Sequence, residues 1–205
     1  QAQLCRFEDR SDTGELPPPA SKASSCGKKL TFDAREHLYR MAGVDLTQIV
    51  GLNTPTVLTL LSEVGLDMSR WPTSKHFASW LGLCPGSKIS GGKNFSSKSK
   101  PSANRAAHAF RMAAYSLHRS QSAIGAFLRR KKAQLGAPKA ITATAHKIAR
   151  IFYVMLKTRT EYKDLGADYY QNRYKQRMLR NLKRKAKEFG LELINSNQDQ
   201  LVIAN

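Results

Sequence analysis

Acidic residues are absent from a long part of this chain. Between Met68 and Thr160 there is no Asp or Glu, although the same stretch holds 18 Lys and Arg residues. The 205-residue chain as a whole carries 34 Lys and Arg against 15 acids, for a formal net charge of +19. Because so much positive charge repels itself, the imbalance predicts a polyanionic partner such as nucleic acid. The acid-free stretch also cannot supply the converging carboxylates of a metal-dependent nuclease.

Long apolar runs and paired cysteines are missing as well. No stretch approaches the roughly 20 apolar residues that span a bilayer, and the polar first 15 residues are unlike a signal peptide. Cys5, Cys26 and Cys84 are far apart and lack zinc-binding spacing. The sequence therefore predicts no membrane partner, no structural zinc and free thiols in a reducing cytoplasm. Because it begins with Gln1 rather than Met, we expect a fragment of a longer protein.

The residues that are present predict a mainly α fold. Apolar side chains recur at three- and four-residue spacing between Gly, Pro and Ser punctuation. Helices are expected near residues 34–41, 54–64, 74–81, 103–118, 122–135, 138–157 and 168–188. Thr54 is expected to cap the second of these, with Pro55 in its first turn. Residues 86–100 hold three glycines, five serines and four lysines, which predicts an exposed Ser-Gly loop or short hairpin.

These patterns divide the chain into four parts. Residues 1–30 predict a linker or tail, 31–120 a helical domain, 121–194 a long, basic helical extension, and 195–205 a flexible tail. Within the extension, one stretch without acids carries eight cations: Arg173, Lys175, Arg177, Arg180, Lys183, Arg184, Lys185 and Lys187. This stretch is either a phosphate-binding face or a solvated basic tail.

The turn at residues 50–54 is the first candidate for phosphate binding. Gly51 permits a tight turn, and the following helix start would aim backbone amides at a phosphate, with Asn53 and Thr54 beside it. The pattern is typical of a helix-hairpin-helix, although Asn53 stands where a second glycine is usual. Asn tolerates positive φ, so the turn remains possible. An ordinary interhelical turn explains the same residues equally well.

Ser90 is the candidate nucleophile. Gly91 and Gly92 follow it and would let a ligand approach closely, and basic residues surround it. The neighbouring cations that would bind phosphate are Lys88, Lys93, Lys98, Lys100 and Arg105. A serine that attacks a phosphodiester needs access and nearby positive charge, and this segment provides both. By spacing alone, a serine in a flexible turn is the commoner explanation.

A tyrosine recombinase is the competing interpretation. It would need Arg, then His-x-x-Arg, then Tyr. His146 and Arg150 are one residue too far apart, and Tyr153 follows almost at once. The pattern therefore disfavours a tyrosine nucleophile.

Three ordered blocks resemble IS110-type insertion-sequence transposases. They are residues 49–65, residues 70–85 and the run Ser90-Gly91-Gly92-Lys93. Residues 103–105 lie where family members begin a similar basic helix, and the helices up to about Leu193 resemble one branch of the family. The resemblance covers about three quarters of the chain, and three blocks with the right gaps are more specific than any one alone.

The resemblance implies that residues 31–120 are the C-terminal domain of an RNA-guided DNA recombinase. In that family an N-terminal RuvC-like domain binds magnesium through four acids, and a C-terminal serine becomes attached to DNA. On this chain the serine is Ser90, and the four acids have no counterpart. We therefore expect no cofactor in this chain itself, magnesium from an N-terminal domain, and an inactive fragment when it is alone.

The resemblance also implies the partners. They are DNA, a structured guide RNA and, at full length, further copies of the protein, in the bacterial cytoplasm at the nucleoid. The alternative is a non-catalytic helix-hairpin-helix module that binds DNA or RNA. It explains the charge equally well, but it does not explain the three ordered blocks.

Overall fold

The structure is a computed structural model that describes residues 9–11, 15–19, 34–86, 88–96, 99 and 101–192. In this part of the chain the elements are α1 (Ala34–Ala42), a 3-10 helix (Leu46–Gln48), α2 (Thr54–Val64), α3 (Ser74–Trp80), β1 (Lys88–Ser90), β2 (Lys93–Ser96), α4 (Arg105–Ser116), a 3-10 turn (Leu117–Arg119), α5 (Ala123–Leu135), α6 (Ala137–Thr158) and α7 (Gly166–Glu188). The predicted mainly α fold is confirmed, and the Ser-Gly segment is a short hairpin.

Polar side chains fix where four helices begin. Each accepts a hydrogen bond from the backbone amide three residues on, which satisfies one of the unpaired donors at a helix start. The pairs are Asn53 with Thr56, Thr73 with His76, Asn104 with Ala107 and Ser122 with Gly125. The predicted cap at Thr54 was wrong, because Asn53 makes this bond and Thr54 is the first helical residue. Pro55 lies in the first turn, as predicted.

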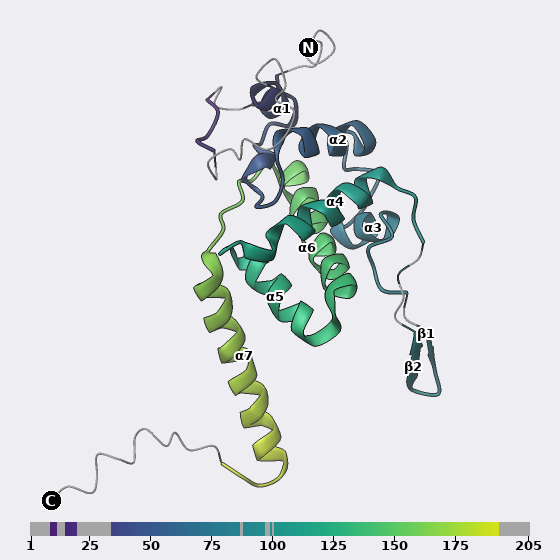
Figure 1. Cartoon of the computed structure of the whole chain (residues 1–205), viewed down its shortest axis with the longest axis vertical. Coiled ribbons are helices and arrows are strands. Elements are labelled where there is room, and N and C mark those ends of the chain that lie inside the picture. The colour runs from purple at the N-terminus through teal and green to yellow at the C-terminus, as the bar shows by residue number, and fades with distance from the viewer. Residues whose placement is uncertain are drawn as a thin grey trace, which may run out of the picture.

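Three phenylalanines from α3, α4 and α6 form the centre of the core. Phe77, Phe110 and Phe152 are fully buried. Their ring centroids are 6.4 Å apart for Phe77–Phe110, 6.4 Å for Phe77–Phe152 and 5.4 Å for Phe110–Phe152. Burying each such side chain contributes about 1.5–3 kcal/mol to stability. The longest of the three helices, α6, packs against α3, α4 and α5, and it thus connects the N-terminal helices to the C-terminal ones (Figure 1).

The same core continues across residue 120. Ile124 and Leu128 of α5 and Ile148 of α6 belong to one buried cluster with Val57 and Phe77. The buried cluster is thus continuous across residue 120, and the division of the chain into four parts stays a prediction. The proposed linker and tail, residues 1–30 and 195–205, lie mostly or wholly outside the described residues.

Two elements project from the helical body. Figure 1 shows the β1–β2 hairpin extending from one side and α7 extending from the other. The hairpin follows α3, and an isolated antiparallel bridge between Pro85 and Ser99 closes its base. Among the described helices, none is both long enough and apolar enough to cross a bilayer.

Candidate nucleic-acid interface

Two consecutive glycines form the tip of the β-hairpin. Gly91 has φ of +54° and Gly92 has φ of +73°, so both occupy the left-handed region that other residues rarely adopt. Two such residues between paired strands are typical of a tight turn whose twist matches that of the strands. The sequence Ser-Gly-Gly-Lys thus encodes this turn, and it presents the residues on either side of it at the outermost point of the hairpin.

Ser90 and Lys93 face each other across this turn. They are direct partners in the antiparallel register, and directly paired side chains lie on the same face with Cβ atoms about 5 Å apart. Both residues are exposed. The structure therefore brings the predicted nucleophile and one predicted phosphate-binding lysine together. Lys88 begins β1 of the same hairpin and pairs through its backbone with Ser96.

The space around the tip is open. A Cβ atom built on Gly91 or Gly92 meets no atom within 4 Å, and Ser90 beside them is exposed. The apolar side chains of the hairpin are uncovered too, with Ile89 67% and Phe95 72% exposed. Uncovered apolar residues at the end of a projecting hairpin are typical of a surface that meets another molecule.

The predicted phosphate turn before α2 is built differently from a helix-hairpin-helix. A 3-10 helix of three residues precedes it in place of an α-helix. Gly51 has φ of +97°, and a Cβ atom on it would lie 2.9 Å from the Ala113 carbonyl oxygen of α4. Gly51 thus lets the turn pack closely against the end of α4. Its contact with phosphate remains a prediction, as do those of Asn53 and Thr54.

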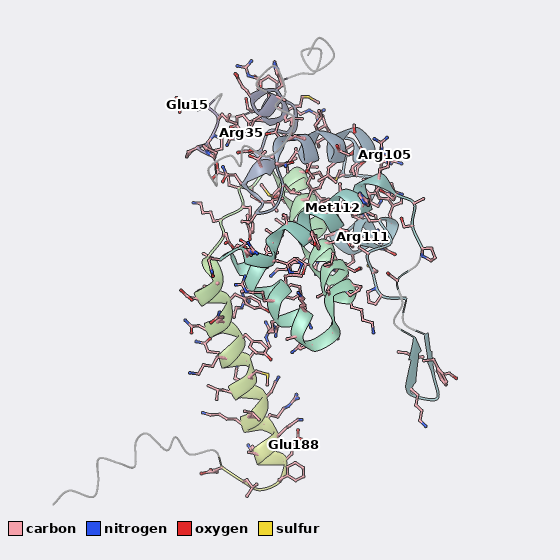
Figure 2. All side chains as sticks on the ribbon, viewed as in Figure 1. Glu15, Arg35, Arg105, Arg111, Met112 and Glu188 are labelled. Atoms are coloured by element: carbon pink, nitrogen blue, oxygen red, sulfur yellow. The ribbon has the colours of Figure 1, made fainter. Side chains whose placement is uncertain are left out.

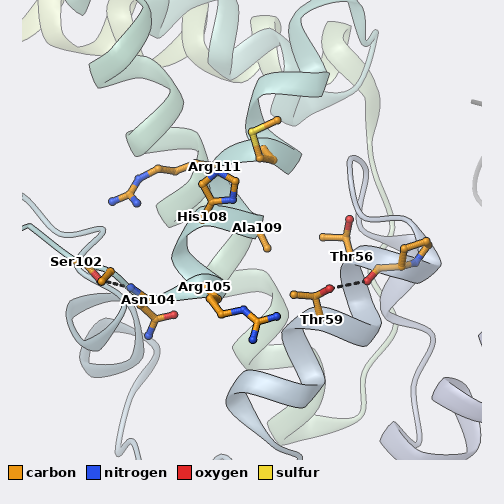
Figure 3. Close-up of a pocket in the computed structure, with 11 residues that line it drawn as sticks. Thr56, Thr59, Ser102, Asn104, Arg105, His108, Ala109 and Arg111 are labelled. Atoms are coloured by element: carbon orange, nitrogen blue, oxygen red, sulfur yellow. Dashed lines mark hydrogen bonds between the residues drawn. The ribbon is translucent and has the colours of Figure 1, made fainter. Parts of the chain in front are cut away.

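A basic hollow is lined by α2 and the first half of α4. Its volume is about 590 Å³, and its lining includes Thr56, Thr59, Asn104, Arg105, His108 and Arg111. None of the described residues that line it is acidic. Figure 3 shows the two threonines on α2 facing Arg105, His108 and Ala109 on α4. Imidazole and guanidinium groups are donors that proteins use for phosphate oxygens. The two threonine hydroxyls donate within α2 and its cap, Thr56 to Asn53 Oδ1 and Thr59 to the Pro55 carbonyl oxygen.

Among the described residues that line this hollow, Arg105 is the one that the sequence predicted as a site residue. Its guanidinium lies 3.0 Å from the Glu63 carboxylate, and the two side chains are 77% and 28% exposed. An exposed pair of this kind contributes about 0–1 kcal/mol, so a phosphate can replace Glu63 at little cost. Arg105 and Arg111 are both labelled in Figure 2, on the same helix.

The predicted site residues thus occupy three places. Lys88, Ser90, Gly91, Gly92 and Lys93 belong to the hairpin, Gly51, Asn53 and Thr54 lead into the start of α2, and Arg105 begins α4. Lys98 and Lys100 lie outside the described residues. Sequence reasoning missed the rest of the hollow. A signal was available, because Arg105, His108 and Arg111 recur every third residue, away from the buried face of that helix.

The tyrosine of the competing interpretation is buried. Tyr153 is 3% exposed and donates a hydrogen bond to the Trp71 carbonyl oxygen at 2.6 Å. Its hydroxyl also accepts a hydrogen bond from Lys157 Nζ at 3.0 Å. Burial, with a smaller contribution from Arg150, lowers the pKa of His146. Tyr153 therefore belongs to the core, and it does not present its hydroxyl to a polymer.

Residues 43–129 match the Transposase IS116/IS110/IS902 family. The match includes α2, α3, the hairpin and α4, and it ends within α5. It supports an IS110-type transposase domain over this segment and, in general terms, a role in DNA transposition with DNA as the substrate. No curated protein and no solved structure matches the chain significantly.

The described residues of the chain do not fit a magnesium centre. They contain no group of three or more His, Cys, Asp or Glu that could hold a metal ion. Magnesium prefers several oxygen ligands in near-octahedral geometry, and carboxylates usually supply them. The hairpin and the hollow offer hydroxyls and cations in place of carboxylates.

Proposed function

We propose that the hairpin presents Ser90 as the nucleophile of DNA strand exchange during transposition. The observation that carries this proposal is the Ser90–Lys93 pair at an open hairpin tip, within the segment that matches a transposase family. The serine oxygen forms a bond to phosphorus, and the bond from phosphorus to one deoxyribose oxygen breaks. The serine loses its hydroxyl proton, and the leaving oxygen gains one.

Lys93 stabilises the phosphate at the moment of attack. Negative charge accumulates on the non-bridging oxygens, and a cation placed beside them lowers the barrier. Lys93 is the direct cross-strand neighbour of Ser90. The described residues provide no carboxylate cluster for magnesium. Any metal that the reaction requires would be held by acidic residues outside the described part of the chain.

The α2–α4 hollow holds the DNA backbone while the hairpin acts. Its Arg105, Arg111 and His108 bind phosphates without reading the bases, which fixes position and makes the affinity depend on salt. The guide RNA, the homo-oligomer and the contacts of the turn at Gly51, Asn53 and Thr54 are part of the same proposal. They rest on the resemblance and on the charge of the chain.

A covalent-adduct assay tests the nucleophile. The chain is incubated with an acidic RuvC-like domain, guide RNA, magnesium and labelled DNA, then denatured and examined for label on the protein. Ser90→Ala is expected to abolish the label and to leave DNA affinity within about twofold, because a small neutral hydroxyl supplies little of the phosphate attraction. Ser99→Ala, in the same segment, is the matched control and is expected to keep the label.

Lys93→Gln tests whether Lys93 stabilises the transition state or only attracts the DNA through its charge. It is expected to slow adduct formation at least about tenfold, because one positioned donor to the transition state is worth that or more. Lys139→Gln removes the same charge from the exposed start of α6 and is expected to change the rate little. Equal slowing in both variants would assign Lys93 only to general attraction.

The second candidate function is binding without chemistry. The basic hollow between α2 and α4 favours it independently of the hairpin. If the wild type binds DNA but gives no adduct under any of these conditions, the hollow alone describes what the chain does.

A further inference from the structure

The first half of α7 is anchored on α5. The Ala167 amide donates to the Gln121 carbonyl oxygen at 3.0 Å, and the Asp164 carboxylate accepts from the Ala123 amide at 3.1 Å. Arg130 of α5 lies 4.0 Å from the ring centroid of Tyr174. A guanidinium at this distance over an aromatic face contributes about 0.5–2 kcal/mol. The direction of α7 is therefore set by contacts at its root.

The second half of α7 leaves the helical body. Tyr170 and Tyr174 lie against α5, and Met178 and Leu182 continue the same four-residue spacing. These last two side chains are 40% and 47% exposed. In Figure 2 the half of the helix that ends at Glu188 stands clear of the other helices. The second half of α7 thus extends into solvent, while the contacts of the first half with α5 fix its direction.

A row of cations runs along this helix. Arg173, Arg177, Arg180, Arg184 and Lys187 follow one another at spacings of four, three, four and three residues. That spacing keeps them on one face, and all five are exposed. The acids on α7 are Asp168 in its first turn and Glu188 at its end. Glu188 approaches Arg184 only to 3.9 Å, between exposed groups.

Like charges stacked at these spacings oppose helix formation. A row of this kind is relieved when polyanionic phosphates neutralise it. The row spans about 21 Å at 1.5 Å per residue, which exceeds the roughly 12 Å width of the B-DNA major groove and reaches phosphates on both of its sides. The major groove of duplex RNA is too deep and narrow for the same fit. Four of the five cations are arginines, which form paired hydrogen bonds to phosphates.

We propose that residues 173–187 of α7 form a second DNA-binding surface, which binds duplex DNA along this row. This surface is separate from the hairpin and from the α2–α4 hollow. Its fixed root gives the bound duplex a defined direction relative to the helical body. The proposal uses no residue of the proposed catalytic site, and it holds whether or not Ser90 is the nucleophile.

The test compares two charge-matched double variants of the whole chain. Arg180→Gln with Arg184→Gln removes two members of the row, and Lys175→Gln with Lys185→Gln removes two exposed cations from other faces of the same helix. Binding to a labelled DNA duplex is measured by fluorescence anisotropy at several salt concentrations. The row variant is expected to bind the duplex roughly tenfold more weakly. Its plot of log affinity against log salt concentration is expected to be less steep by about 2, because two phosphate contacts are lost. The control is expected to lose less than threefold.

Three further measurements separate this surface from its alternatives. Circular dichroism of both variants is expected to show unchanged helix content. Equal losses in the two variants would overturn the proposal in favour of general charge. It is also overturned if the row variant loses as much affinity for an RNA duplex, or for anionic phospholipid vesicles, as for DNA. Ser90→Ala is expected to bind like the wild type, so failure of the catalytic proposal is scored separately by the adduct assay.

Discussion

Tyr153 on α6 donates a 2.6 Å hydrogen bond to the backbone carbonyl oxygen of Trp71, which is 82 residues earlier in the chain. This bond ties the last helix of the core to the turn that precedes α3. Trp71 also packs its ring edge-to-face with Phe77, with centroids 5.1 Å apart. Helix α6 lies beyond residues 43–129, the segment that matches the family, and it therefore stabilises the fold of that segment.

Removing that hydroxyl is expected to destabilise the whole fold. Tyr153→Phe leaves the Trp71 carbonyl buried without this donor, and such a loss costs about 1–3 kcal/mol. Chemical denaturation measures the change in the free energy of unfolding. Tyr115→Phe, at a residue that is 57% exposed, is the matched control and is expected to change stability by less than about 0.5 kcal/mol.

Gly51 is expected to matter for packing. Gly51→Ala must adopt φ of +97° and place its Cβ atom 2.9 Å from the Ala113 carbonyl oxygen. Gly65→Ala faces a φ of +79° in open space, and its ψ of −177° lies in a region essentially limited to glycine, so it isolates a backbone cost of about 1–3 kcal/mol. Denaturation is expected to show the larger loss for Gly51→Ala. A loss of DNA affinity without a loss of stability would instead support the phosphate contact.

The cap of α2 can be tested by comparing substitutions at two neighbouring residues, Asn53 and Thr54. Asn53→Ala removes the acceptor of the Thr56 amide, 3.0 Å away, and is expected to cost about 1 kcal/mol. Thr54→Ala changes the first helical residue and is expected to be nearly neutral. Thermal unfolding of the two variants measures both effects, and the opposite ranking would restore Thr54 as the cap.

Stability is expected to fall on mild acidification because of His146. Burial, and then Arg150, lowers the pKa of His146 in the folded chain, while the unfolded value is about 6.5. The unfolded state thus binds the proton more readily. The contribution of neutral His146 to the free energy of unfolding is therefore fully present above about pH 6.5. It is lost as the pH falls through the lower pKa of the folded state. His146→Gln is expected to flatten this part of the stability profile, and an unchanged profile would contradict the assignment.

Local sequence patterns predicted most of the fold. Apolar spacing located every α-helix of the described residues to within about three residues at each end, because a helix must bury one face. Prediction failed where several residues compete for one role. Asn53 and Thr54 are both good caps, and only the backbone conformation decides between them. Tyr170, Tyr174, Met178 and Leu182 recur every fourth residue along α7, yet the two tyrosines lie against Arg130 of α5 while Met178 and Leu182 are exposed.

The candidate site was predicted less completely. Gly91 and Gly92 specify their own turn, so the pairing of Ser90 with Lys93 follows from adjacent residues. The hollow joins Thr56 and Thr59 of α2 to His108 of α4, about 50 residues away. No local pattern reports such a contact, because it depends on how α2 and α4 pack. The stacking of Arg130 on Tyr174 escaped prediction for the same reason.

The most direct test of the account is to find which residue carries the DNA. Trypsin cleaves after Lys88 and Lys93 and releases residues 89–93, a peptide whose only hydroxyl belongs to Ser90. The adduct formed with magnesium, guide RNA and the acidic domain is digested with nuclease and trypsin and analysed by mass spectrometry. The account predicts a nucleotide mass on residues 89–93. A nucleotide on any other peptide, whether it carries another serine or Tyr153, would contradict the account.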